Sequence, residues 1–222
     1  MSALLKAIQK KVGAIPDGIY GGETELAIGK ALDVEVPTVE IDMTRLFREI
    51  KAVTGALSQV QVDSINAIVS RMKQQPIQMM AYVLATAWHE ARFKPQREWG
   101  RGIGKKYGRK GKYGQPQYGR GLVQLTWDYN YEWADQRLGL DGALLQDFDL
   151  ALKPDIAADI LCIGMIEGAF ASNGKPLSHY GPKANGTFDY YHARQTVNRL
   201  DKAELIAGHA RKFEAAIRRA MA

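Results

Sequence analysis

The sequence predicts a mainly α-helical protein, and three observations support this fold class. Apolar residues recur with the 3.6-residue period of a helix through most of the chain after about residue 41. Prolines and capping patterns fall where such helices would begin. No stretch alternates apolar and polar residues as a half-buried strand does, apart from a short turn of sheet expected near residues 100–120.

The chain is expected to divide into a small N-terminal unit, residues 1–36, and a main domain, residues 38–222. With 222 residues and 46% hydrophobic content it can bury one sizeable core, but not two full domains. A first short helix is indicated by Leu4, Leu5, Ile8 and Val12. The turn Pro16-Asp17-Gly18 leads to a second helix at about 23–32, and residues 34–38 are the expected linker.

One helix of the main domain has a well-marked start. Ser58 and Gln61 have the spacing of a capping box, in which each residue satisfies a backbone N–H at the helix start. Leu57 and Val62 occupy the two positions of a hydrophobic staple. A helix is therefore expected from residue 58 to about residue 73.

The next helix is expected to begin at Pro76, which suits a first turn, and to run until Pro95 forbids its continuation. Its apolar positions keep the helical period and are Ile77, Met80, Leu84, Ala87, Trp88 and Ala91. This helix delivers His89 and Glu90 at its C-terminal end. Further helices are expected at about 127–138, 154–170 and 201–222.

Composition restricts the chemistry that the chain can perform. The net charge of +6 favours an anionic polymer as partner, which could be nucleic acid, a membrane surface or a bacterial wall. Cys162 is the only cysteine and lies in an apolar run, so we expect a small buried hydrophobe and no disulfide or zinc cluster.

The first residues of the chain do not have the pattern of a leader. Polar residues interrupt the apolar ones too soon for a signal peptide, and no run approaches the ~18 apolar residues of a membrane span. The expectation is a protein made in the cytoplasm, which needs an external route to any substrate outside it.

Glu90 and Glu98 are candidates for an acid–base pair. Hydrolysis of a glycosidic bond needs two carboxyl groups, one protonated and one ionised. Glu90 has apolar neighbours in the sequence, which favours its neutral form, whereas Arg97 and Arg101 flank Glu98 and favour ionisation. The spacing by itself is more often that of two solvated surface charges.

Three separated segments carry a family resemblance. In chain order they are Leu84–Glu90, Pro95–Gly100 and Tyr118–Tyr131. Together they resemble glycoside hydrolase family 19, the chitinase-like family, and most closely its phage and bacterial lysozyme branch. Agreement continues through 154–158, 164–168, 193–198 and 201–203, so that the resemblance covers roughly residues 42–215.

The N-terminal unit resembles the peptidoglycan-binding modules found at the ends of wall hydrolases. The resemblance rests on residues 8–11, 17–21 and Thr24. The module would be a truncated one, with two helices in place of three. A helical extension that packs on the main domain is the alternative.

The resemblance implies a role for each site residue. Glu90 would be the general acid, Glu98 the general base, and Thr126 the hydroxyl that helps to position the attacking water. Sugar contacts would come from Gln124, Asn130, Asn198, Tyr118 and Trp99. His89 is expected to orient its neighbours by hydrogen bonds and not to transfer protons.

The resemblance also implies a two-lobed, lysozyme-like helical domain with the glutamates in the cleft. Inversion at the anomeric carbon would need a gap of roughly 6.5–9.5 Å between the two carboxyl groups. The implied substrate is the β-1,4 bond between N-acetylmuramic acid and N-acetylglucosamine in peptidoglycan. The implied setting is a phage or prophage endolysin that a holin releases from the host cytoplasm to act on the wall, as a monomer without cofactor, metal or nucleic acid.

Two other functions stay open. A chitinase that acts on poly-N-acetylglucosamine would use the same acid–base mechanism. A non-catalytic wall-binding protein could keep the fold, although the presence of Glu90, Glu98 and Thr126 argues against it. A zinc protease is excluded because Phe93 stands where the second histidine of the metal helix would be.

Two basic segments have more than one interpretation. Residues 100–120, here named the cationic loop, interleave glycine with lysine and arginine and contain no acidic residue. They could be a solvated loop or an electrostatic guide to an anionic wall, and less readily a nucleic-acid patch. The C-terminal helix has Ile206, Phe213 and Ile217 on one side and basic residues largely on the other, so it either docks on the core, which is favoured, or disturbs the outer membrane.

Overall fold

The computed structural model describes residues 3–13, 22–33, 40–171 and 173–221. These residues form nine α-helices, several short 3₁₀ turns and one two-stranded sheet, so the predicted mainly α class is confirmed. The predicted turn at residues 16–18 and the whole of the predicted linker, residues 34–38, lie outside the described residues.

The two N-terminal helices match their predictions. They are α1 (Ala3–Val12) and α2 (Gly22–Leu32), and they pack against each other. Gln9 Nε2 donates a hydrogen bond to Thr24 Oγ1 at 2.9 Å, and both side chains are buried. A buried polar contact thus helps to hold the two helices together.

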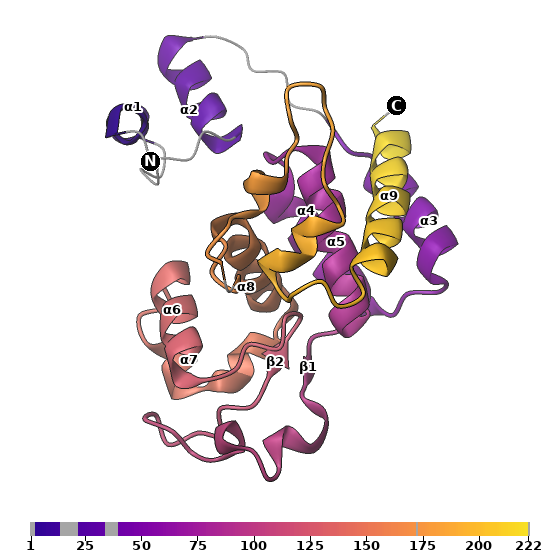
Figure 1. The fold of residues 1–222 in the computed structure, drawn as a ribbon. Helices are drawn as coiled ribbons and strands as arrows, with labels where there is room; N and C mark the ends of the chain where they lie inside the picture. The colour runs from indigo at the N-terminus through magenta and orange to yellow at the C-terminus, as the bar shows by residue number, and fades with distance from the viewer. Residues whose placement is uncertain (1–2, 14–21, 34–39, 172, 222) are drawn as a thin grey trace.

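The main body contains seven helices and a short antiparallel ribbon (Figure 1). The helices are α3 (Met43–Thr54), α4 (Gln59–Met72), α5 (Ile77–Ala91), α6 (Asp128–Leu138), α7 (Ala143–Gln146), α8 (Pro154–Glu167) and α9 (Ala203–Ala220). The strands are β1 (Gln96–Arg97) and β2 (Arg120–Gly121). The 3₁₀ turns are η1 (Trp99–Gly102), η2 (Lys106–Gly108), η3 (Phe148–Leu152), η4 (Leu177–Tyr180) and η5 (His192–Thr196).

The start of α4 is the predicted one. The capping box is present, and the Ser58 backbone N–H donates to Gln61 Oε1 at 2.8 Å. The Nε2 atom of Gln61 donates to the carbonyl of Arg92 at 2.7 Å. The same side chain therefore caps α4 and ties it to the end of α5.

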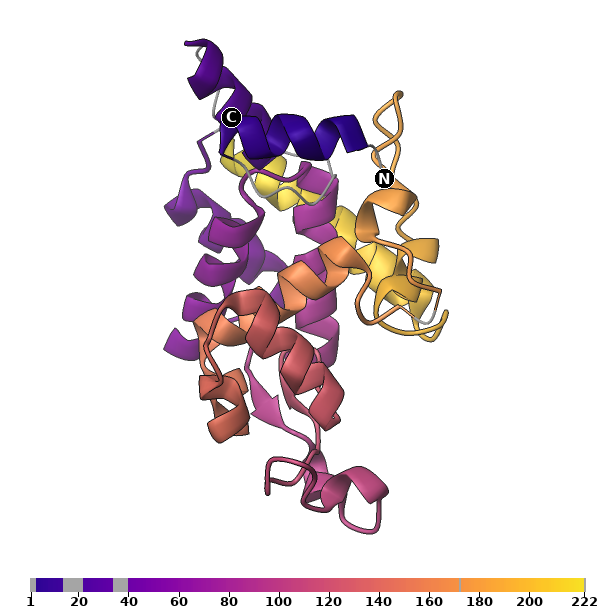
Figure 2. The same cartoon turned by 90° about the vertical axis from the view of Figure 1, so that its left-hand side faces the viewer.

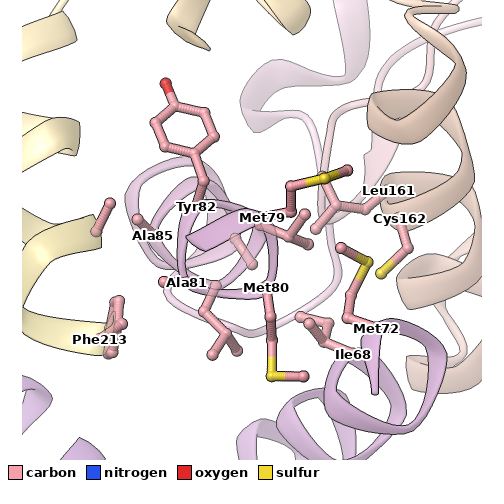
Figure 3. Close-up of a cluster of buried hydrophobic side chains, with 14 of the residues drawn as sticks. Ile68, Met72, Met79, Met80, Ala81, Tyr82, Ala85, Leu161, Cys162 and Phe213 are labelled. Atoms are coloured by element: carbon pink, nitrogen blue, oxygen red, sulfur yellow. The ribbon is translucent and has the colours of Figure 1, made fainter. Parts of the chain in front are cut away.

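Helix α5 is enclosed on all sides, which its predicted amphipathic pattern did not indicate. Every residue from Met79 to Ala87 is buried. Figure 3 looks along this helix, with Phe213 of α9 on one side and Ile68 of α4 and Leu161 of α8 on the other. A helix that is apolar all round is buried all round, and its alanines let the neighbouring helices approach closely.

The sequence predicted that α5 runs until Pro95, but this prediction is wrong. The helix ends four residues earlier, where Arg92 takes the left-handed conformation and its N–H bonds to the carbonyls of Ala87 and Trp88. Phe93 is also left-handed and is fully buried, with its ring 5.8 Å from that of Phe213. Burial of this aromatic ring outweighs the backbone strain of two residues with positive φ. Helix α8 likewise ends early, at left-handed Gly168 and not at residue 170.

The buried apolar residues form two clusters, consistent with two lobes. The larger surrounds α5 and includes α3, α4, α8 and α9. The smaller is formed by Leu125, Tyr131, Ala134, Leu144, Phe148, Ala151 and Ile160. Because Ile160 belongs to α8, this helix joins the two clusters.

The cationic loop joins β1 to β2 and has more internal structure than predicted. Two 3₁₀ turns, η1 and η2, lie at its start, and Lys110 pairs with Pro116 in an isolated antiparallel bridge. In Figures 1 and 2 it projects from the end of the molecule away from the C-terminus.

Helix α9 docks on the core. Ile206, Phe213 and Ile217 are fully buried against α3 and α5, whereas the basic side is exposed. Its apolar face is therefore already covered by protein. Among the described residues no helix is both long and apolar enough to cross a bilayer.

Candidate active site

Glu90 lies in the last turn of α5 and is held by a buried arginine. Arg194 Nη1 donates to Glu90 Oε1 at 2.6 Å, and Arg194 is only 2% exposed. Its Nε atom donates to the carbonyl of Asp201 at 2.9 Å, so the guanidinium is fixed from two sides. The apolar surroundings predicted for Glu90 are wrong in this respect: its closest polar partner is a cation.

Arg194 has a role that the sequence analysis missed. Its segment, 193–198, was assigned to the family resemblance without a function for the arginine. A buried arginine needs a negative partner, because an unpaired charge away from water is very costly. The need for such a partner can be recognised only once Arg194 is known to be buried. The Asn198 N–H donates to the carbonyl of Arg194 at 3.0 Å, which places this predicted sugar contact one turn away, with its side chain exposed.

Glu98 lies between β1 and η1 and is held by two uncharged donors. Its Oε1 accepts from the Tyr107 hydroxyl at 2.9 Å, and its Oε2 accepts from the Gly119 N–H at 3.2 Å. The hydrogen bond to the carboxylate raises the pKa of Tyr107, so this hydroxyl stays a donor. Arg97, which was expected to favour the charge on Glu98, instead pairs with Asp149 at 2.6 Å. No side-chain partner of Arg101 was found among the described residues.

Gly119 brings three predicted site residues together. Its N–H binds Glu98, and a Cβ at this glycine would lie 2.9 Å from Gln124 Oε1 and 3.3 Å from Thr126 Oγ1. Thr126 Oγ1 donates to the Gln124 carbonyl at 2.7 Å, and Asn130 Nδ2 donates to the Thr126 carbonyl at 2.7 Å. The predicted base, the predicted hydroxyl and two predicted sugar contacts thus form one connected cluster around Gly119, which has no side chain. This cluster is named the Gly119 cluster.

The segment around Thr126 is strained. Gln124 and Trp127 have φ values of +56° and +74°, although neither is glycine. Such conformations cost of order 1–3 kcal/mol each and persist where the surroundings enforce them, often at functional sites. The Trp127 ring packs edge-on against Tyr107 at 5.5 Å, which links the strained segment to the donor on Glu98.

An ion cluster around the buried Arg120 lies next to this site. Arg120 is 3% exposed and donates to Asp149 Oδ1 at 2.6 Å, to the Tyr131 hydroxyl at 3.1 Å and to the Tyr118 carbonyl at 3.0 Å. Burial opposes the charge on Asp149, but the hydrogen bonds from Arg97 and Arg120 outweigh it and hold its pKa below the usual range. Burial raises the pKa of Tyr131 to about 12, which keeps its hydroxyl protonated.

Tyr118 and His89 have other surroundings than expected, whereas Trp99 offers an open face as a stacking residue would. Tyr118 is only 6% exposed and one face of its ring is covered by the Arg120 guanidinium at 3.7 Å, so it does not offer an open stacking face. Trp99 is 97% exposed beside Glu98. His89 makes no side-chain hydrogen bond within the described part of the chain, and burial lowers its pKa, so the predicted orienting bond is absent.

The predicted site residues therefore fall into two groups. One contains Glu90 with Arg194 beside it, and the other contains Glu98 and the Gly119 cluster; no hydrogen bond or ion pair among the described residues joins the two directly. No group of His, Cys, Asp or Glu residues suited to a metal ion occurs in the described residues. Burial raises the pKa of the Cys162 thiol, which favours its unreactive protonated form.

A separate cavity of about 530 Å³ lies between α4, α6 and α8 and contains none of the predicted site residues. Ion pairs between Arg71 and Asp159 and between Arg137 and Glu167 lie along it. They join neighbouring helices, so we interpret these charges as structural.

The chain was compared with known families, curated proteins and solved structures. None of them matches. The resemblance to family 19 glycoside hydrolases therefore rests on the residues themselves.

Proposed function

We propose that the chain is a glycoside hydrolase that cleaves β-1,4 bonds of bacterial peptidoglycan with inversion, as an endolysin does. Glu90 is the general acid and Glu98 the general base. The observation that supports this most is the Gly119 cluster, in which a carboxylate, a threonine hydroxyl and a glutamine side chain, all partly buried, meet beside the smaller lobe. Three such groups are what the activation of a water molecule beside an amide-bearing sugar requires.

The contacts of Glu98 suit a base. A carboxylate has about four lone-pair sites, and the two neutral donors occupy only one on each oxygen. The remaining sites can accept the proton of a water molecule. Because the donors are uncharged, they fix the orientation of the carboxylate without neutralising it as an arginine would.

The contacts of Glu90 suit an acid that ends its step as an anion. Protonated Glu90 would give its proton to the leaving oxygen and become a carboxylate. The Arg194 guanidinium stabilises that carboxylate by a charge-assisted hydrogen bond, which is weaker before the proton has left. The same guanidinium also disfavours the protonated form from which an acid starts, so the acid role of Glu90 rests mainly on the family resemblance.

The first test is activity of wild type, Glu90→Gln and Glu98→Gln on purified peptidoglycan, read by mass spectrometry of the released fragments. We expect new reducing N-acetylmuramic ends from wild type and a loss of at least ~10²-fold in each variant. Chitin oligomers run alongside would identify a chitinase. Amide-cleaved peptides, or full activity in both variants, would refute the glycosidase assignment.

The division of roles has its own test, an aryl glycoside whose leaving group needs no proton. Glu90→Gln should regain most activity on this substrate, whereas Glu98→Gln should stay inactive. The opposite result would exchange the two roles. Thr126→Ser against Thr126→Val is the matched pair for the hydroxyl: the first should stay active and the second should lose activity.

A further inference from the structure

The cationic loop and the residue before it carry two exposed apolar side chains, here together called the patch. Trp99 is 97% exposed and Ile103 is 86% exposed, and these are the two most exposed large hydrophobic side chains in the described part of the chain. Single exposed apolar residues are ordinary, but two of this size four residues apart mark a surface for contact. The loop projects away from the body of the molecule (Figures 1 and 2), so both can reach a partner.

Five exposed cations accompany the patch. They are Arg101, Lys105, Lys106, Arg109 and Lys110. Lys112 and Arg120 of the same loop are paired, with Glu132 and Asp149, but the five have no ion pair among the described residues. The sequence has no acidic residue from 99 to 127. Glu98 and Asp128, just outside this span, accept hydrogen bonds from Tyr107 and from the Lys112 N–H. The loop is therefore positive overall, with these two carboxylates compensating part of its charge.

The loop holds this surface in a preformed shape. Gly102 and Gly108 pack backbone to backbone, since a Cβ on Gly108 would lie 2.0 Å from the Gly102 carbonyl oxygen. Backbone hydrogen bonds close successive turns at Ile103, Lys105 and Gly108. A surface that is already ordered loses little conformational entropy on binding.

We propose that this surface docks on a bilayer containing anionic phospholipids. It consists of Trp99, Arg101, Ile103, Lys105, Lys106 and Arg109, and is named the docking surface. Tryptophan and an aliphatic side chain are favourable at the interface of a bilayer, and lysine and arginine pair with lipid phosphates. A soluble polyanion would also pair with the cations, but it would leave Ile103 without a contact. The apolar residues thus favour lipid over nucleic acid or a wall polymer.

This proposal is independent of the proposed function, because binding to lipid is measured without any glycan. Tyr107, in the same loop, holds Glu98. Docking would therefore keep the predicted base close to the membrane surface.

Co-sedimentation of the full chain with vesicles tests the charges. We expect binding to phosphatidylcholine vesicles that contain phosphatidylglycerol and little binding to phosphatidylcholine alone. Lys105→Glu/Lys106→Glu should weaken binding by roughly 30-fold or more, since each cation at an anionic membrane contributes about a factor of five. Lys51→Glu/Lys212→Glu makes the same change in net charge on α3 and α9 and should alter binding less than about threefold.

The apolar residues have a separate test. Trp99→Ser/Ile103→Ser should weaken vesicle binding by about tenfold or more, because two apolar side chains no longer leave water. Leu205→Ser, at an exposed site of α9, is the control and should bind as wild type does. Wild-type fluorescence should shift to the blue with anionic vesicles, and Trp99→Phe should lose that shift while still sedimenting.

Three results would overturn the proposal. Equal binding to neutral and anionic vesicles would show that the cations do not contribute to docking. Absence of binding to either kind of vesicle would show that the surface does not dock on a bilayer. Polyphosphate or DNA binding as tight as vesicle binding, with Trp99→Ser/Ile103→Ser unaffected, would assign the surface to a soluble polyanion.

Discussion

The larger helical cluster and the cationic loop are held together by different forces. Around α5 the chain buries long runs of apolar side chains, and among them lie two buried hydroxyls, on Ser64 and Tyr82, without a hydrogen-bond partner among the described residues. In the loop the backbone is folded by glycines, turns and ion pairs, while Trp99 and Ile103 stay in water. Burial of apolar side chains thus stabilises the larger helical cluster. The cationic loop contributes little apolar burial and holds polar groups in place on that stable body.

Truncation of a core side chain should have the largest effect on stability. Phe213 is fully buried on α9 and contacts Phe93 edge-on. We expect Phe213→Ala to lower the free energy of unfolding by about 3–5 kcal/mol, because it leaves a cavity in the larger cluster. Leu205→Ala, on the exposed side of the same helix, should cost less than ~1 kcal/mol. Urea denaturation of both variants measures the difference, and equal losses would mean that α9 is not packed as described.

Loss of the ion cluster should be the next largest effect. Asp149→Asn removes the negative charge that faces Arg97 and the buried Arg120. We expect a loss of about 2 kcal/mol, because Arg120 keeps its hydrogen bonds but not its counter-charge. Glu204→Gln breaks a pair whose partners are both exposed and should cost less than ~0.5 kcal/mol. A similar melting temperature for the two variants would contradict this ranking.

Replacement of glycine by alanine should lower the free energy of unfolding in the loop and raise it in α9. In the loop, Gly108→Ala places a Cβ against the Gly102 carbonyl and should cost about 1–2 kcal/mol. In α9, Gly208→Ala meets no atom within 4 Å and should gain about 0.5–1 kcal/mol from helix propensity. Hydrogen exchange should show faster exchange at the Arg109 amide only in the first variant. A gain from both would mean that the loop is not tightly turned.

Mild acid should have the smallest effect. Burial lowers the pKa of His89 and of His209 from 6.5, and nearby cations, Arg92 among them, act in the same direction. The carboxylate of Glu90 opposes the shift at His89, and Lys212 adds to it at His209. The unfolded chain therefore binds protons more readily, so stability is full above about pH 6.5 and falls as the pH drops below it.

The expected loss is below ~1 kcal/mol for each histidine, since both side chains are only partly buried. Denaturation curves at pH 7.5 and at pH 5.5 measure it. In His209→Gln the dependence should be about half as steep, and an unchanged dependence would assign it to other groups.

Several elements could be predicted from local sequence. The capping box at Ser58 and the starts of α6 and α8 follow from contacts within one or two turns of the chain, so local residue types suffice. The same holds for the burial of Cys162, which lies in a continuous apolar run. The end of α5 could not be predicted, because burial of Phe93 decides it. The end of α8 was placed too late, although Gly168 is a local stop signal.

The candidate site shows the same division. The sequence by itself determined the mainly helical class, since that depends on residue type and local spacing. Glu90 and Glu98 were weak candidates by residue type, and only the family resemblance made them a predicted pair and added Thr126. Only the tertiary structure decided that Arg194, 104 residues further on, pairs with Glu90. It also decided that Arg97 turns to Asp149 and leaves Glu98 to neutral donors. The partner of a charged side chain depends on which segments pack together in the folded protein, and the separation of residues along the chain does not indicate this.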